Sequence, residues 1–196
     1  HKKWYFSFAR EQAKIINSCD PKNFNDKVAL IVGICDDFMP NTLLQTANQT
    51  YKNIDVWLCD DSKNEKNKEF INSFAKEHGF FVMRRDPEHK KMHKSKVGNT
   101  FYWLNKYGSK YDYVFENDSS TIVTSTFVEH CLCYYHSELL KDKKIGGIIC
   151  NGMFYSTKSL LTDIYSKSFQ VFLSLEYQKW LMPFEKVLGL NGWCSF

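Results

Sequence analysis

The chain has 196 residues, of which 43% are hydrophobic and 16% aromatic. This composition supports one sizeable domain with a packed core and excludes an intrinsically disordered chain. The net charge is only +4, and basic residues concentrate within residues 84–96. That distribution indicates a local anionic partner and argues against a nucleic-acid-binding surface. No apolar run reaches the roughly 18 residues of a membrane-spanning helix, so we expect no such helix in this chain.

The seven cysteines are scattered, odd in number and without a CxxC pair, which argues against a zinc site. Cys35, Cys59 and Cys150 lie in or beside apolar runs, where a free cysteine behaves as a small hydrophobic residue. We therefore expect reduced thiols and a protein that faces the cytosol. Because the chain begins without Met, we expect a piece of a longer protein whose other segments reach a membrane.

The chain opens with an expected arm at residues 1–26. Apolar residues recur at helical spacing over residues 3–17, and the turn-rich residues 18–26 follow as a linker. The main domain is expected at 27–196, cut short at its C-terminal end.

Strands and helices are expected to alternate through this main domain. Residues 27–34 (KVALIVGI) are continuously apolar, which is typical of a strand buried on both faces. Gly79 is expected to end a charged helix. The expected strands are 27–34, 54–59, 80–83, 111–115 and 145–150, and the expected helices are 40–48, 64–78, 96–106, 125–140 and 159–181. This order predicts an α/β fold with a central, mostly parallel sheet flanked by helices.

Ligands of such sheets bind at the carboxyl ends of the strands. Acidic residues follow three of the first four expected strands, in Cys35-Asp36-Asp37, Asp60-Asp61-Ser62 and Glu116-Asn117-Asp118. The remaining strand, 80–83, is followed by Arg84-Arg85. Converging carboxylates are stable beside a cation, or beside donors such as ribose hydroxyls and uracil N–H. The alternative is that Asp37 and Ser62 only cap helices.

Two further stretches carry candidate chemistry. In residues 94–99 (KSKVGN), a lysine beside a glycine at a helix N-terminus suits a diphosphate. In residues 115–121 (FENDSST), two acids one residue apart could bridge a divalent ion to a diphosphate. Walker and GxGxxG motifs are absent, which argues against a nicotinamide dinucleotide. The alternatives are a solvated basic loop and a plain turn.

The order of these motifs resembles family 2 glycosyltransferases, which have the Rossmann-like GT-A fold that binds nucleotide-diphospho-sugars. Val28–Ser62 looks like the family's opening, with Gln49-Thr50-Tyr51 and Asp60-Asp61-Ser62 in place. Residues 94–99 are similar to the HAKAGN-like segment of membrane-bound, cellulose-synthase-like members.

The resemblance continues to the end of the chain. Residues 121–123 (TIV) are similar to the end of the family's DADTIV segment, and 188–193 (LGLNGW) look like its GHNA-type segment on the acceptor side. The likeness covers 27–196 and is nearest in pattern to membrane glucosyltransferases that make bacterial glucans.

The resemblance implies a donor site. Asp61 would contact uracil, with Asp37 or its neighbour Asp36 beside the base. Lys96 would contact the diphosphate, and Asp118 would be the first Asp of the DxD motif, binding diphosphate and metal.

It also implies a metal and an acceptor rim. The metal, Mg²⁺ or Mn²⁺, would be held by Asp118 with Glu116 and Ser120. Ser120 replaces the second Asp of DxD, and a hydroxyl is a poor metal ligand. Asn191 and Trp193 would lie on the acceptor rim.

The catalytic base is not identified. The family's TED-like acid and QxxRW segment have no match here, and both are expected after Asn191, beyond the end of the chain. Glu176 and Glu185 are read as exposed helix acids.

The function expected is therefore inverting transfer of a hexose such as glucose from a UDP-sugar to a saccharide or lipid acceptor. The enzyme would be metal-dependent and serve polysaccharide or glycolipid synthesis at the cytoplasmic face of the cell membrane, anchored through other segments of a parent chain. Two alternatives stay open: a donor-binding or scaffold domain without turnover, and a sugar-phosphate nucleotidyltransferase.

Overall fold

The computed structural model describes residues 10, 13–93 and 96–137. The chain divides into two compact units, residues 1–148 with Phe196 and residues 149–195, and all described residues belong to the first. The expected strand at 145–150, the expected helix at 159–181 and the acceptor-rim residues Asn191 and Trp193 lie outside the described residues.

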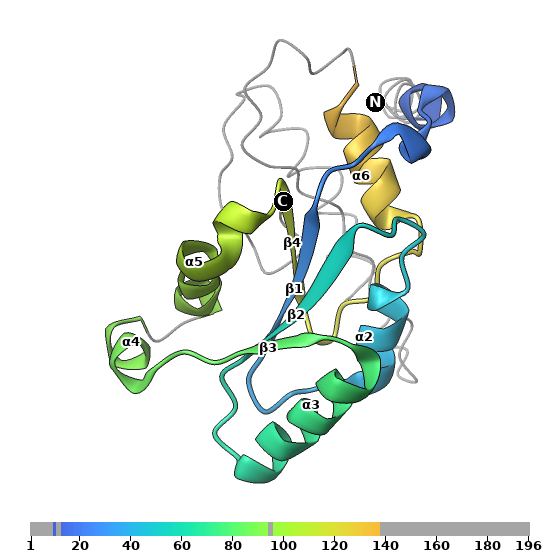
Figure 1. The fold of residues 1–196 in the computed structure, drawn as a ribbon. Coiled ribbons are helices and arrows are strands. Elements are labelled where there is room, and N and C mark those ends of the chain that lie inside the picture. Colours follow the sequence, from blue (N-terminus) through green and yellow to red (C-terminus); the bar gives the residue numbers. More distant parts are fainter. Residues whose placement is uncertain (1–9, 11–12, 94–95, 138–196) are drawn as a thin grey trace, which may run out of the picture. The chain divides into compact units, whose positions relative to one another are not determined.

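The described part contains a sheet of four parallel strands in the order β3-β2-β1-β4 (Figure 1). The strands are β1 (Val28–Ile34), β2 (Ile54–Asp60), β3 (Phe81–Met83) and β4 (Tyr113–Asp118). The predicted α/β class with a parallel sheet is confirmed for this part of the chain. Since β2 and β3 lie on one side of β1 and β4 on the other, the strand order reverses between β1 and β4.

The core explains why β1 is a continuous apolar run. Its residues from Val28 to Val32 are at most 1% exposed, because helices cover both faces of the sheet. On one face, Ala29 and Ile31 pack with Trp57 and Trp103. Each large side chain buried in this way stabilises the fold by about 2 kcal/mol.

The helices lie in two layers. In Figure 1, α4 (Pro87–Met92) and α5 (Lys96–Tyr107) lie to one side of the strands, and α2 (Pro40–Ala47), α3 (Glu65–His78) and α6 (Phe127–Tyr135) lie to the other. No helix among the described residues is long and apolar enough to cross a membrane.

Local signals account for the helix ends. Pro40 begins α2, where its missing N–H costs nothing. The Asn64 side chain caps α3 by accepting from the Lys66 N–H, and Gly79 ends this helix with φ of 70°. The expectation of only a loop between β3 and α5 is wrong. Asp86 accepts from the His89 N–H and Pro87 occupies the first turn, so these residues begin α4.

The fourth strand begins and ends later than expected. Residues 111–115 were expected, whereas β4 spans Tyr113–Asp118, so Glu116, Asn117 and Asp118 belong to the strand. Alternation explains the polar residues, because successive side chains point to opposite faces. Glu116 is paired with Ile31 of β1 and Asp118 with Gly33, so both acids lie on the face covered by α5.

A disulfide between Cys19 and Cys133 corrects the expectation that the cysteines are all reduced. It joins the segment before β1 to α6, 114 residues apart, and the Phe24 and His136 rings pack nearby with centroids 4.7 Å apart. Scattered spacing could not show this pairing. Disulfides persist mainly in oxidising compartments, so the cysteines no longer support a cytosolic location, which stays a prediction.

Candidate functional site

The candidate site lies where β1 and β4 end, on the face of the sheet covered by α5. The strand order reverses between these two strands, and parallel α/β sheets usually bind ligands at such a reversal, at the carboxyl ends of the strands. The expected positions along the chain therefore meet at one edge. Lys96 arrives there from the first residue of α5, while Glu116 and Asp118 arrive from β4.

These three side chains form what we call the lysine–carboxylate cluster. Lys96 Nζ hydrogen-bonds Asp118 Oδ1 and lies 3.6 Å from Glu116 Oε1. The Lys96 and Asp118 side chains are 37% and 36% exposed. Three of the predicted diphosphate and metal residues are thus brought together, with the lysine between the two acids.

Two neighbours shape this cluster. A Cβ built at Gly33 of β1 would lie 3.3 Å from Lys96 Cε, so the glycine leaves the space that the lysine stem crosses. Thr100, one turn along α5, donates its hydroxyl to Glu116 Oε1 at 2.8 Å. Neither residue was assigned a role from the sequence. Their signals, a glycine near the end of a buried strand and a hydroxyl four residues after the lysine, are too common to be specific.

Asp61, the predicted uracil contact, takes part in a second arrangement. Arg85, placed after β3, donates from Nε and Nη2 to the two Asp61 carboxylate oxygens, and Lys90 Nζ lies 3.5 Å from Oδ1. The Asp61 and Arg85 side chains are only 13% and 4% exposed. Arg85 belongs to the basic strand end noted in the sequence but had no assigned role, since nothing local indicates its partner.

The start of α5 packs closely on this pair. Arg85 Nη1 also donates to the His93 carbonyl oxygen, and a Cβ at Gly98 would lie 2.7 Å from Arg85 Nη1 and 2.5 Å from His93 Cβ. Asn99 is buried and donates to the Cys59 carbonyl oxygen at 2.8 Å. Thus Gly98 and Asn99 of the predicted phosphate motif anchor α5 to the sheet.

The pKa of the Cys59 thiol, on β2, is affected by acids of both arrangements. Burial raises the pKa of its thiol, and the negative charges of Glu116 and Asp61 raise it further. This thiol stays protonated, so it is no nucleophile.

Asp36 and Asp37 are held by local hydrogen bonds. The Asp36 carboxylate accepts from the Lys63 and Asn64 N–H groups and from the Asn67 amide. These hydrogen bonds, led by the one from Lys63, lower the pKa of Asp36. Asp37 Oδ1 accepts from the Cys35 N–H at 2.7 Å. The capping alternative is not met, because the residue that precedes α2 is Met39, without a side-chain cap, and Ser62 Oγ accepts from the Asp36 N–H. A base-binding role for Asp37 stays a prediction.

The carboxylates do not fit a divalent metal as they are arranged. The point on which Glu116 and Asp118 converge holds the Lys96 ammonium, and a second cation there would be repelled. Ser120 is exposed in the turn after β4 and supplies no carboxylate. Within the part of the chain that the structure describes, no group of three or more His, Cys, Asp or Glu side chains is placed to hold a metal.

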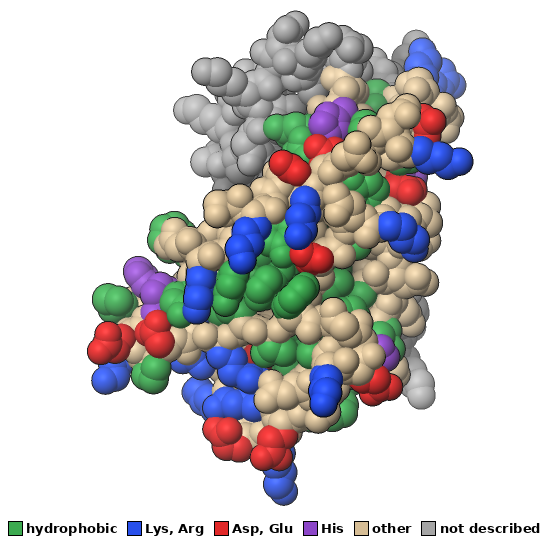
Figure 2. All heavy atoms as spheres, in the orientation of Figure 1, with side chains coloured by type: hydrophobic (Ala, Val, Ile, Leu, Met, Phe, Trp, Pro, Cys, Tyr) green, Lys and Arg blue, Asp and Glu red, His purple; other side chains and the backbone are tan. Residues whose placement is uncertain are grey.

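Figure 2 shows a further surface area, rich in hydrophobic side chains, beside α5. Lys and Arg side chains flank hydrophobic ones between α5 and β3. Trp57 and the 45%-exposed Phe81 stack with centroids 4.7 Å apart, and Lys106 and Lys110 Nζ each lie 5.6 Å from the Tyr107 ring. The ammonium groups of these two lysines therefore interact with an aromatic ring of the protein itself.

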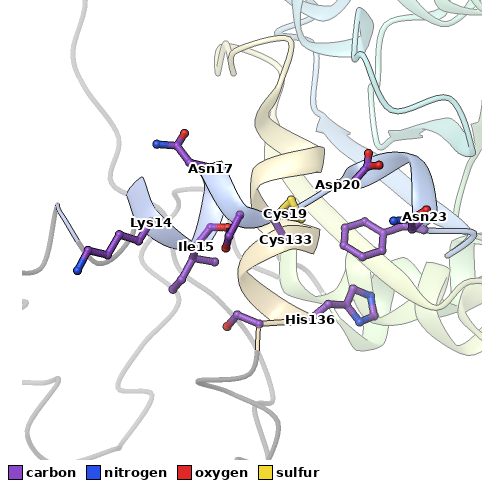
Figure 3. Close-up of a pocket in the computed structure, with 11 residues that line it drawn as sticks. Lys14, Ile15, Asn17, Cys19, Asp20, Asn23, Cys133 and His136 are labelled. Atoms are coloured by element: carbon purple, nitrogen blue, oxygen red, sulfur yellow. A yellow bond between two sulfur atoms is a disulfide. The ribbon is translucent and has the colours of Figure 1, made fainter.

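A pocket of about 780 Å³ lies away from the strand ends, beside the disulfide (Figure 3). Its wall includes Lys14, Phe24 and His136, and the His136 ring nitrogen contacts Asp26 at 3.0 Å. Asp26 precedes β1, so this pocket belongs to the amino-terminal edge of the sheet. None of the predicted donor-site residues lines it.

Comparison with known proteins adds no assignment. No protein-family model matches this chain, and no curated protein matches it.

Proposed function

We propose that this protein binds a nucleotide-diphospho-sugar at the β1–β4 edge and is the donor-binding part of a glycosyltransferase with a GT-A fold. In this proposal Asp61 contacts the base and Lys96 the diphosphate. The acceptor is a saccharide or lipid, and the whole protein acts at the cytoplasmic face of a membrane. The observation that carries the proposal is the meeting of Lys96, Glu116 and Asp118 at the strand-order reversal.

The chemistry asked of these residues is binding and orientation. An ammonium group offers three N–H donors to anionic oxygens. The first turn of α5 adds backbone N–H groups and the positive end of the helix dipole. Holding the diphosphate while charge develops on it would favour departure of the nucleotide as an acceptor hydroxyl attacks from the opposite side of the sugar. Metal dependence stays a prediction from the resemblance, and the position of the Lys96 ammonium between the two carboxylates does not favour it.

A second candidate, donor binding without turnover, is favoured by one observation. Lys96 is already paired with the carboxylate that corresponds to the first DxD acid, and Ser120 stands at the second. The same strand-end site would then serve to sense or present the donor. The nucleotidyltransferase alternative gains no support from a Gly-rich loop, because β1 contains Gly33 alone.

The test is calorimetric titration of UDP and UDP-glucose into the 196-residue chain and into Asp61→Asn and Lys96→Met variants. We expect saturable binding that weakens about tenfold or more in each variant, equivalent to about 1.4 kcal/mol or more. The matched controls are Glu77→Gln and Lys76→Met, two exposed positions on α3, which should leave the Kd unchanged.

Absence of binding to the wild-type chain would contradict the proposal. Equal weakening by the α3 controls would show that net charge, and not the strand-end site, determines affinity. Turnover of UDP-glucose in the presence of a glucan or lipid acceptor would separate the transferase from the non-catalytic candidate.

A further inference from the structure

The Lys96 ammonium lies where a divalent ion would have to bind between Glu116 and Asp118. An ammonium group and a divalent ion both neutralise carboxylates, yet they differ in charge and in the number of ligands they need. Divalent ions of this class take about six or more oxygen ligands. An ammonium group is satisfied by three hydrogen-bond acceptors.

The described residues place two carboxylates around the ammonium group, fewer ligands than a divalent ion needs. Asp118 accepts directly from Lys96 Nζ, and Glu116 Oε1 lies 3.6 Å away. Glu116 is not free to turn elsewhere without loss, because its Oε1 also accepts from Thr100. Lys96 Nζ thus has one hydrogen bond to a carboxylate and one longer ion pair, which leaves N–H donors for a further anionic oxygen.

The fold also prepares this position for a lysine. Lys96 is the first residue of α5, and its stem passes over Gly33, where any side chain would come within 3.3 Å of it. Gly33 is paired with Asp118 across the β1–β4 ladder. The lysine stem therefore lies directly beside the strand position that carries its carboxylate partner.

The residue after the strand adds a third observation. Ser120 follows Asp118 by two positions and is exposed. A serine carries no negative charge, so this position adds nothing to the two carboxylates of β4. With a serine, the cluster has two negative charges and one positive charge of its own.

We infer that the Lys96 ammonium takes the place of a divalent ion between Glu116 and Asp118, so that a nucleotide diphosphate binds here without metal. The inference rests on the proposed function for its ligand, but the competition between lysine and metal does not. Lys96 and a divalent ion exclude each other from the two carboxylates, and a remaining N–H of Lys96 contacts the diphosphate.

Two measurements test it, each on the wild-type chain and on Lys96→Met, with Lys76→Met as the control. The first titrates Mn²⁺ alone and follows the free ion by electron paramagnetic resonance. We expect weak binding to the wild-type chain and to the control, and about tenfold tighter binding to Lys96→Met, because the two carboxylates lose their competing cation.

The second measurement titrates UDP with EDTA and again with Mn²⁺. The wild-type Kd should agree within about twofold between the two conditions, a difference of about 0.4 kcal/mol. Lys96→Met should bind UDP poorly with EDTA and recover part of the affinity with Mn²⁺. The variant would thus become metal-dependent where the wild type is not.

Each failure has its own meaning. Wild-type UDP binding that disappears with EDTA would overturn the inference while supporting the proposed nucleotide site. Mn²⁺ binding that is equally tight with and without Lys96 would overturn the competition itself. If UDP binds to neither protein in either condition, the proposed function fails, and the Mn²⁺ titration alone decides whether lysine and metal compete.

Discussion

The two charged arrangements at the carboxyl edge of the sheet differ in burial. Asp61 and Arg85 are 13% and 4% exposed and meet through two hydrogen bonds. Lys96 and Asp118 are 37% and 36% exposed and meet through one. A buried pair is costly to break, because the remaining charge has no water around it, whereas a half-exposed pair exchanges its partner for solvent at little cost.

This difference in burial separates a rigid pair, Asp61–Arg85, from a cluster that a bound ligand can rearrange. The Asp61–Arg85 pair joins the ends of β2 and β3, and Arg85 also contacts the His93 carbonyl oxygen at the end of α4 and packs against the start of α5. The lysine–carboxylate cluster remains accessible and can be rearranged by a ligand. In the proposed site, the Asp61–Arg85 pair therefore keeps Asp61 in a fixed position for the base, and the cluster at the end of β4 adjusts to the diphosphate.

Arg85→Met should give the largest effect on stability. It removes the bidentate partner and leaves the buried Asp61 with only Lys90 at 3.5 Å. We expect the free energy of unfolding to fall by about 3 kcal/mol or more, measured by urea denaturation at neutral pH. Lys76→Met, exposed on α3, is the control. A decrease in the free energy of unfolding of less than about 1 kcal/mol would mean that the Asp61–Arg85 pair contributes no more than an exposed ion pair.

Gly98→Ala should give the next largest effect. The new methyl group would overlap the Arg85 side chain, His93 Cβ and the His93 carbonyl oxygen, the last at 2.7 Å. The overlap should cost about 1–3 kcal/mol, against a gain in helix propensity of about 1 kcal/mol. The measurement is again urea denaturation.

Gly108→Ala is the matched control for that substitution, because its nearest neighbour would be the Leu104 side chain at 3.4 Å. Two glycine variants with equal stability would mean that the start of α5 can move away from Arg85. In that case the surroundings of the Asp61–Arg85 pair would not be more rigid than the lysine–carboxylate cluster.

Lys96→Met should give the smallest effect on stability. Its pairs with Glu116 and Asp118 are partly exposed, so we expect the free energy of unfolding to change by less than about 1 kcal/mol. The same substitution should strongly affect ligand binding, as described above. A loss of stability equal to that of Arg85→Met would show that the cluster is a structural element.

The elements with local signals could be predicted from the sequence. The buried strand β1 follows from its apolar run, and α3 follows from Asn64 at its start and Gly79 at its end. The helix α4 was missed because six residues rich in Lys and His give no apolar period, although Asp86-Pro87 is a recognisable start signal. The end of β4 was missed because its last three residues, 116–118, are polar, and a polar run gives no apolar pattern of a strand.

For the candidate site, the sequence identified Lys96, Glu116, Asp118 and Asp61 as polar residues at strand or helix ends. Parallel strands have a common direction, and their carboxyl ends must share an edge. The partners of these residues depend on contacts between elements far apart in the chain. Arg85 meets Asp61 across 24 residues, Lys96 meets Asp118 across 22, and Cys19 meets Cys133 across 114.

The sequence by itself therefore determined the α/β class, most of the elements and the edge at which ligand chemistry is expected, because periodicity, caps and strand direction are local properties. Only the tertiary structure decided which acid is neutralised by which base, which carboxylates cap a helix, and which pair remains open to solvent. Charge pairing and burial arise when separate strands and helices pack together, and no short stretch of sequence contains that information.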